Sequence, residues 1–261
     1  TLNQTTLTGG LSVVGGAVFN YDGAVTINQS TITGNVGLVG GAVVSVSPDS
    51  TMDISNSVFT DNAGAKYGSA ITTLGETTLT NTTIENNANK YLGGSVANLG
   101  MLTITNSTIN SNSTKYGSGA GILNKEGTLT LTGSTVANNV ASGNADVGGF
   151  DGGGFGGGIF NINGNVTLTS STISGNSSDF SGGGLFNYTY SAPTASFAKR
   201  QMQTALSPAA ADKLQARGID AARLKRWETK IANLKMRAAA RVQTQAADTA
   251  TMTVINSTVS N

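Results

Sequence analysis

The chain repeats a pattern of short apolar–polar alternations separated by turns rich in glycine and asparagine. One unit places such alternations at residues 18–20, 25–28 and 30–32, and similar segments return about 25 residues later. Alternation over a few residues between turn residues predicts short β-strands. The repeat can be followed through one apolar anchor position, which is occupied by Leu7, Ile32, Phe59, Ile84, Ile109, Val136, Ile173 and Val259.

The anchors are separated by 25, 27, 25, 25, 27, 37 and 86 residues, so the last two intervals contain insertions. Strands this short gain hydrogen bonds only from the equivalent strand one repeat away, at about 4.8 Å. Equivalent residues then stack, and three apolar columns are expected to enclose a core: the anchors; Ile27, Ile54, Leu79, Ile104, Leu131, Leu168 and Val254; and Val18, Val43, Ile71, Val96, Ile122, Ile159 and Leu185. The sequence therefore predicts an all-β fold, a right-handed single-stranded parallel β-helix of about eight coils.

Asparagine recurs at two fixed places in the repeat. One set follows the anchor by three residues, and the other follows the third apolar column: Asn35, Asn62, Asn87, Asn112, Asn139 and Asn176, then Asn20, Asn98, Asn124, Asn161 and Asn187. Asparagine accepts turn conformations and can bond the amide of the next coil. We interpret both sets as ladders that close the turns. The alternative is ligand contact, or glycosylation where Asn106-Ser107-Thr108 fits the acceptor pattern.

Two motifs carry a resemblance to a known family. Gly-Gly-Ala-Val occurs at residues 15–18 and again at 40–43, and Phe59-Thr60-Asp61-Asn62 ends a later coil. This pairing resembles the GGA[IV] and FxxN repeats of polymorphic outer-membrane autotransporter passengers. It is also similar to the pectate-lyase-like β-helices of filamentous adhesins. The resemblance covers residues 1–191 and 250–261, and it implies an adhesin.

The two long intervals divide the chain into coils and insertions. We expect coils over residues 1–191, interrupted by a glycine-rich loop at 141–158, and a last coil at 250–261. Residues 192–249 differ, because Ala, Lys, Arg and Gln replace Gly, Thr and Asn there. Ser207-Pro208 and Asp220 read as helix starts and Gly218 as a stop, which predicts an α-helical insertion near the C-terminus.

The predicted insertion is basic, whereas the coils are acidic. Residues 192–250 hold 11 Lys or Arg and 4 Asp or Glu, and the rest of the chain holds 4 and 10. The main helix has an apolar stripe that includes Trp227, with Arg223, Lys230 and Arg237 among its charges. Such a helix can pack on the coils with its charges solvated, contact a neighbouring protein, or bind lipid or nucleic acid. We expect no nucleic-acid partner, because aromatic interleaving and known binding motifs are absent.

The glycine-rich loop carries two carboxylates, Asp146 and Asp151. Two carboxylates near glycines are weak candidates for a calcium site, and the alternative is a simple spacer. The loop does not match the Gly-Gly-x-Gly-x-Asp calcium repeat. We therefore expect no cofactor, with calcium as the one alternative.

Composition removes several classes of active site. The chain has no cysteine and no histidine, which excludes thiolate metal sites, disulfides and Ser-His or Cys-His pairs. A polysaccharide-cleaving β-helix would then depend on carboxylates, which here fall in different columns: Asp22, Asp49, Asp53, Asp61, Glu76, Glu85 and Glu126. We expect no enzyme, with a polysaccharide lyase or hydrolase as the alternative.

Two surface patterns are candidates for binding. A Lys-Tyr pair recurs at nearly the same turn of three coils, with a slip of one residue, as Lys66-Tyr67, Lys90-Tyr91 and Lys115-Tyr116. These pairs predict either a patch that binds glycans or anions, or an edge of solvated side chains. Outward threonines form two ranks that resemble ice-binding faces, although threonine also simply suits a solvent-facing strand. The ranks are Thr26, Asp53, Thr78, Thr103, Thr130, Thr167 and Thr253, and Asn28, Ser55, Thr80, Thr105, Thr132 and Thr169.

The sequence as a whole favours a non-catalytic scaffold or adhesin, extracellular or at the cell surface. Its expected partners are other protein subunits or cell-surface glycans. Both ends lie inside a coil, so we expect a fragment of a longer repeat protein or a subunit that stacks head to tail into a filament. No apolar stretch is long enough for a transmembrane helix.

Overall fold

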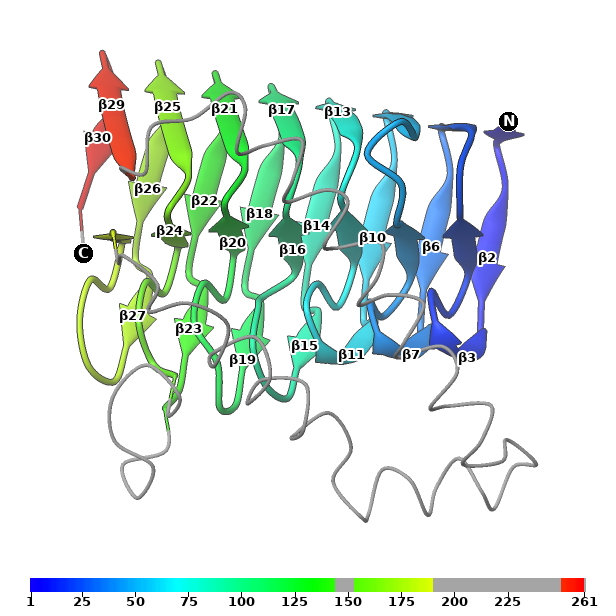
Figure 1. Ribbon diagram of the computed structural model, residues 1–261, viewed down its shortest axis with the longest axis horizontal. Coiled ribbons are helices and arrows are strands. Elements are labelled where there is room, and N and C mark those ends of the chain that lie inside the picture. Colours follow the sequence, from blue (N-terminus) through cyan, green and yellow to red (C-terminus); the bar gives the residue numbers. More distant parts are fainter. Residues whose placement is uncertain (144–152, 190–249, 261) are drawn as a thin grey trace. The chain divides into compact units, whose positions relative to one another are not determined.

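The computed structural model describes residues 1–143, 153–189 and 250–260. The chain divides into two units, residues 1–189 with 249–261, and residues 190–248. The first unit is a stack of coils built from four parallel sheets, and its described residues contain no helix. Strands of successive coils lie side by side from β2 near the N-terminus to β30 near the C-terminus (Figure 1). The predicted helical insertion lies outside the described residues.

Each sheet contains one strand per coil, in chain order and in parallel. Sheet A consists of β1 (Leu2–Asn3), β5 (Ala24–Asn28), β9 (Thr51–Ser55), β13 (Glu76–Thr80), β17 (Met101–Thr105), β21 (Thr128–Thr132), β25 (Asn165–Thr169) and β29 (Thr251–Ile255). Sheet B consists of β2 (Thr6–Thr8), β6 (Thr31–Thr33), β10 (Val58–Thr60), β14 (Thr83–Glu85), β18 (Thr108–Asn110), β22 (Thr135–Ala137), β26 (Thr172–Ser174) and β30 (Thr258–Val259).

The other two sheets complete each turn. Sheet C consists of β3 (Leu11–Val14), β7 (Val36–Val39), β11 (Ala63–Lys66), β15 (Ala88–Asn89), β19 (Ser113–Thr114), β23 (Val140–Ala141) and β27 (Ser177–Ser178). Sheet D consists of β4 (Val18–Asn20), β8 (Val43–Ser45), β12 (Ile71–Thr73), β16 (Val96–Asn98), β20 (Ile122–Lys125), β24 (Ile159–Ile162) and β28 (Leu185–Tyr188). The described residues therefore form seven full turns and part of an eighth.

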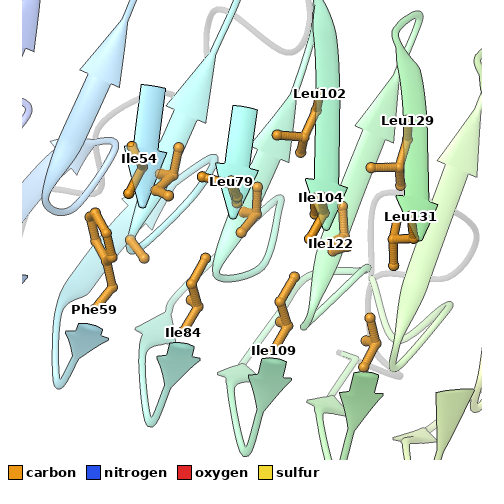
Figure 2. Close-up of a cluster of buried hydrophobic side chains, with 14 of the residues drawn as sticks. Ile54, Phe59, Leu79, Ile84, Leu102, Ile104, Ile109, Ile122, Leu129 and Leu131 are labelled. Carbon is orange, nitrogen blue, oxygen red and sulfur yellow. The ribbon is translucent and has the colours of Figure 1, made fainter. Parts of the chain in front are cut away.

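The three predicted apolar columns are confirmed. The anchors align across sheet B, so that Phe59 pairs with Ile32 on one side and Ile84 on the other. Ile54 and its equivalents align across sheet A, and Val43 and its equivalents align across sheet D. Figure 2 shows Phe59, Ile84 and Ile109 in one row, with the side chains of sheet A in the row beside it. Most members of the three columns are 0 or 1% exposed, which makes one continuous dry core.

Sheet A also provides a second inward column that the pattern did not single out. It contains Val25, Met52, Thr77, Leu102, Leu129, Val166 and Met252. Thr77 is the polar member, and its hydroxyl donates to Thr73 Oγ1 at 2.8 Å. Five-residue strands have room for two inward side chains, so sheet A contributes twice as many core residues per coil as sheet B.

Sheet C is a fourth sheet, where the sequence predicted three strand segments per coil. Its inward positions carry small or polar residues: Ser12, Gly37, Gly64, Asn89, Thr114, Ala141 and Ser178. These residues produce no apolar–polar alternation, although Asn89, Thr114 and Ala141 are almost completely buried. The expectation of three strands was wrong because these inward positions carry small or polar side chains, which give no hydrophobic signal.

The asparagines that follow the anchors form a buried ladder, as predicted. Asn62 Nδ2 donates to Asn87 Oδ1 at 3.0 Å, and the same bond links Asn87 to Asn112. Asn87 Nδ2 also donates to the Phe59 carbonyl at 3.0 Å, and its backbone N–H donates to Asn112 Oδ1 at 3.0 Å. These side chains are at most 4% exposed. Their polar atoms are used inside the fold, so they are not ligand contacts.

A second asparagine ladder runs through the end of sheet D. Asn98, Asn124, Asn161 and Asn187 are linked by side-chain bonds of 2.7 Å. Asn20 instead donates to Ser45 Oγ at 3.3 Å, because Ser45 and Thr73 occupy the asparagine position in the second and third coils. Asn106, the glycosylation candidate, is exposed and has a left-handed φ of 48° at the turn between sheets A and B.

A hydroxyl ladder beside that turn was not predicted. Ser107 N–H donates to Ser134 Oγ at 3.1 Å, while Ser107 Oγ donates to the Thr105 carbonyl at 2.8 Å. Ser30, Thr82 and Ser134 repeat the arrangement. The serine of the Asn-Ser-Thr phrase is therefore structural, since it satisfies one backbone N–H in each coil.

The Gly-Gly phrase marks a tight corner between sheets C and D. Gly40 has a φ of 70°, a left-handed conformation that favours glycine. A Cβ on Gly41 would lie 1.9 Å from the Ser69 carbonyl oxygen, so the next coil leaves no room for a side chain. These two constraints explain why glycine recurs as a pair.

Replacement of Asn87 by alanine is expected to destabilise the coils by about 3 kcal/mol, because it leaves several buried polar groups without partners. Urea unfolding of the whole chain measures the change. The matched control is Asn81→Gly at an exposed corner with a φ of 49°, which glycine also accepts. Equal losses for the two variants would contradict a special role of the buried ladder.

Replacement of Phe59 by alanine is expected to cost about 3–5 kcal/mol, because the cavity lies in the middle of the anchor column. Phe59→Ile, which places the residue of the neighbouring coils at this position, is expected to lose less than half as much. Thermal unfolding followed by circular dichroism compares the two. A Phe59→Ala protein as stable as the parent would be inconsistent with a tightly packed column.

Candidate functional site

The candidate site is the lysine–tyrosine row, defined as Lys66, Tyr67, Lys90, Tyr91, Lys115 and Tyr116. It lies at the ends of the sheet C strands, where the chain turns toward sheet D. Lys115 N–H donates to the Asn89 carbonyl at 3.0 Å, which places Lys115 beside Lys90. Tyr91 N–H donates to the Ala65 carbonyl at 3.0 Å, which places Tyr91 beside Lys66. Two pairs are therefore in register and the third is displaced by one residue, as the sequence predicted.

The two pairs in register form a compact aromatic and cationic strip. The rings of Tyr91 and Tyr116 have centroids 6.1 Å apart and an interplanar angle of 31°. Lys90 Nζ lies 5.0 Å from the Tyr91 ring centroid, and Lys115 Nζ lies 5.3 Å from that of Tyr116. Both lysines are exposed and both rings are half-buried. The tyrosines thus hold each ammonium group near a ring face by a cation–π contact.

Buried side chains under the strip fix its backbone. Thr114 is 1% exposed, and its hydroxyl donates to the Tyr91 carbonyl at 2.9 Å. Asn89 is 4% exposed, and its Nδ2 donates to the carbonyls of Leu92 at 3.1 Å and Gly93 at 2.9 Å. The polar interior of sheet C therefore positions the strip, so its side chains are presented from a defined turn.

The positive charge of the coils is concentrated at this row. Outside residues 192–250 the chain contains four basic residues, all lysine, against ten acidic ones. Lys66, Lys90 and Lys115 belong to the row, and Lys125 lies on strand β20 of sheet D. The row is therefore a local positive potential on otherwise acidic coils, and it favours anionic partners.

The acidic side chains are distributed over several sheets and turns. Asp53 and Glu76 lie on sheet A, Glu85 lies on sheet B, and Asp61 and Glu126 occupy left-handed turns with φ of 56°. Asp22 and Asp49 are exposed in turns between sheets D and A. Within residues 1–143, 153–189 and 250–260, no three acidic side chains gather as a metal ligand set would require.

The threonine ranks lie on the outer face of sheet A, as predicted. Thr78 pairs with Thr103 and with Asp53, and Thr80 pairs with Thr105 and with Ser55. The interruptions at Asn28, Asp53 and Ser55 are all on β5 and β9. The ranks are thus continuous from β13 to β25, and Ile255 follows Thr169 on β29.

An aromatic cluster that the sequence analysis missed lies where sheets C and D end. Phe155 is the centre, with ring centroids 5.5 Å from Phe180 and 5.1 Å from Phe186, and Phe186 lies 5.6 Å from Phe160. Phe180 is 45% exposed. Phe160 and Phe186 are paired in sheet D, so their shared column was the available signal.

Several predicted site residues lie outside the described residues. They are Arg223, Trp227, Lys230 and Arg237 of the basic insertion and the calcium candidates Asp146 and Asp151. Their roles stay predictions. In the part of the chain that the structure describes, no helix has the length and apolar character needed to cross a membrane.

Comparison with known proteins identifies the architecture. A family model described as a right-handed beta helix region matches residues 15–199, which is more than half of the chain. No curated protein and no solved structure gives a significant match. The match agrees with the four parallel sheets and with the direction of winding that the sequence predicted. The chain therefore belongs to the right-handed β-helix family.

Proposed function

We propose that the chain is a non-catalytic scaffold or adhesin, extracellular or at the cell surface, that binds an anionic glycan through the lysine–tyrosine row. The observation that carries this proposal is the strip of Lys90, Tyr91, Lys115 and Tyr116 on two successive coils. Tyrosine rings offer apolar faces with a polar tip, which suits sugar rings. Ammonium groups bind carboxylates and sulfates by charge-assisted hydrogen bonds. The strip supplies both kinds of contact.

The spacing of the strip suits a linear polymer aligned with the stack of coils. Equivalent residues of successive coils are about 4.8 Å apart, so charge and ring repeat along that direction. The binding free energies of contacts with successive sugars of one polymer then add. Because the remaining coil surface carries excess acid, an acidic polymer is repelled elsewhere, which restricts it to the row.

A carbohydrate-active enzyme is the second candidate, since the β-helix fold is consistent with that class. A glycoside hydrolase needs two carboxyl groups on either side of one glycosidic bond. Among the described carboxylates only Asp53 and Glu76 share a sheet, where they lie in different columns of neighbouring strands, and the chain has no histidine as an alternative base. We therefore propose binding without cleavage.

Contacts with protein complete the proposal. We propose that further coils, such as those of a second copy stacked head to tail, pair with this chain by the same parallel strand contacts that join its own coils. We also propose that the basic insertion at 192–249 contacts other protein subunits.

The double variant Lys90→Gln, Lys115→Gln is expected to weaken binding of polygalacturonate by about tenfold or more, because two charged contacts are lost. Tyr116→Ala is expected to weaken it too, through loss of the ring face. Isothermal titration calorimetry of the full chain measures both, and binding to the parent protein should fall with added salt.

The matched control for the charge is Lys125→Gln, which removes the fourth lysine of the coils from sheet D. It is expected to bind like the parent protein. The proposal fails if this control loses as much affinity as the double variant, or if the parent protein binds neither polygalacturonate nor heparin.

Incubation of the parent protein with polygalacturonate, with and without added calcium, is expected to leave the polymer length unchanged. Reducing ends and unsaturated uronate products are the quantities to measure. If either product accumulates, and the activity stays with the protein after repurification, the chain is a carbohydrate-active enzyme and the non-catalytic proposal is wrong.

A further inference from the structure

Eight threonines form an uninterrupted array on the outer face of sheet A. Strands β13, β17, β21 and β25 each carry threonine at their third and fifth positions. The register aligns them into two columns, Thr78, Thr103, Thr130 and Thr167, and Thr80, Thr105, Thr132 and Thr169. We call this set the threonine array.

The array stands on a tightly packed platform. The side chains between and beside its columns point inward and are at most 1% exposed: Thr77, Leu79, Leu102, Ile104, Leu129, Leu131, Val166 and Leu168. All five residues of each strand pair with the next strand in the same register. The threonines therefore repeat at about 4.8 Å across the strands and about 6.6–7 Å along them.

The hydroxyl groups of the array are available to solvent. In the described ranges, none of the eight side chains donates to or accepts from another protein group, and each is half-buried or exposed. Some polar side chains elsewhere on this face bond to each other, as Ser55 does to Asn28 at 3.0 Å and Thr251 to Asn165 at 2.6 Å. The array thus presents eight hydroxyls that no described protein group occupies.

We propose that the threonine array binds the surface of ice. Each threonine offers a hydroxyl that anchors one water molecule and a methyl group that restricts the water beside it. Because these groups repeat in two directions without a charge among them, water over the array is held in a two-dimensional lattice. A growing ice face repeats in the same manner, and the weak contacts of eight side chains add on one rigid surface.

Other partners match the array less well. Protein interfaces are anchored by aromatic, arginine or large apolar side chains, and the array contains none. Sugar binding by stacking needs aromatic rings, which lie instead on the lysine–tyrosine row. The proposal is independent of glycan binding, since the array is on sheet A and the row follows sheet C.

The test compares thermal hysteresis and ice recrystallisation for the whole chain and two double variants. Thr103→Tyr with Thr130→Tyr places bulky rings in the centre of the array, and tyrosine also favours strands, so the fold should persist. Thr83→Tyr with Thr108→Tyr makes the same change on the outer face of sheet B. The array variant is expected to need about tenfold more protein for the same inhibition, because the additive contacts are broken.

The sheet B variant is expected to act like the parent protein, and circular dichroism confirms that both variants are folded. An unfolded array variant is replaced by Thr103→Val with Thr130→Val, which removes two hydroxyls and keeps the shape. The proposal is overturned if the parent protein does not alter ice growth, or if both double variants act alike. The Lys90→Gln, Lys115→Gln variant should inhibit ice growth as the parent protein does, because it leaves the threonine array intact. A negative result for ice binding therefore does not count against glycan binding.

Discussion

Hydrogen bonding between successive coils is the interaction on which the structure depends. The strands are two to five residues long, so none is stable by itself and each takes its partners from the coils on either side. Insertions are accommodated only in turns, after which the chain must return to its columns. It does so after residue 189, because Val254 pairs with Leu168 in the same register as the earlier coils. One slipped coil would misalign the apolar columns and the asparagine ladder together.

Much of the interior could be predicted from the sequence because it repeats the same side chain at the same place. The anchors, the columns of Ile54 and Val43 and the asparagines all occupy their expected positions. Sheet C and the serine ladder were missed for one physical reason. Their inward groups, such as Thr114 and Ser107, are small and polar, and they are buried because hydrogen bonds satisfy them. Hydrophobic patterning does not detect a buried side chain of that kind.

The candidate site was only partly predictable, because the sequence places residues along the chain but not around the turn. Lys–Tyr pairs at a near-constant interval predicted a row, and the structure adds the ring contact and the ammonium groups above the rings. The concentration of positive charge was less evident, since it depends on which turn each lysine occupies. The aromatic cluster around Phe155 combines residues from different coils and sheets, and only its sheet D members share a visible column.

Threonine on an outer strand face is not by itself evidence of a binding surface. The first outward column of sheet B also carries threonine in most coils, with Val58 as an exception, because threonine suits an exposed strand. The array on sheet A differs in having two adjacent and complete threonine columns over four strands. Since the inward side chains beneath both sheets are almost fully buried and tyrosine suits an outer strand face, a bulky side chain on either face is expected to leave the fold intact. Any difference between the two faces toward ice then reports on the surface alone.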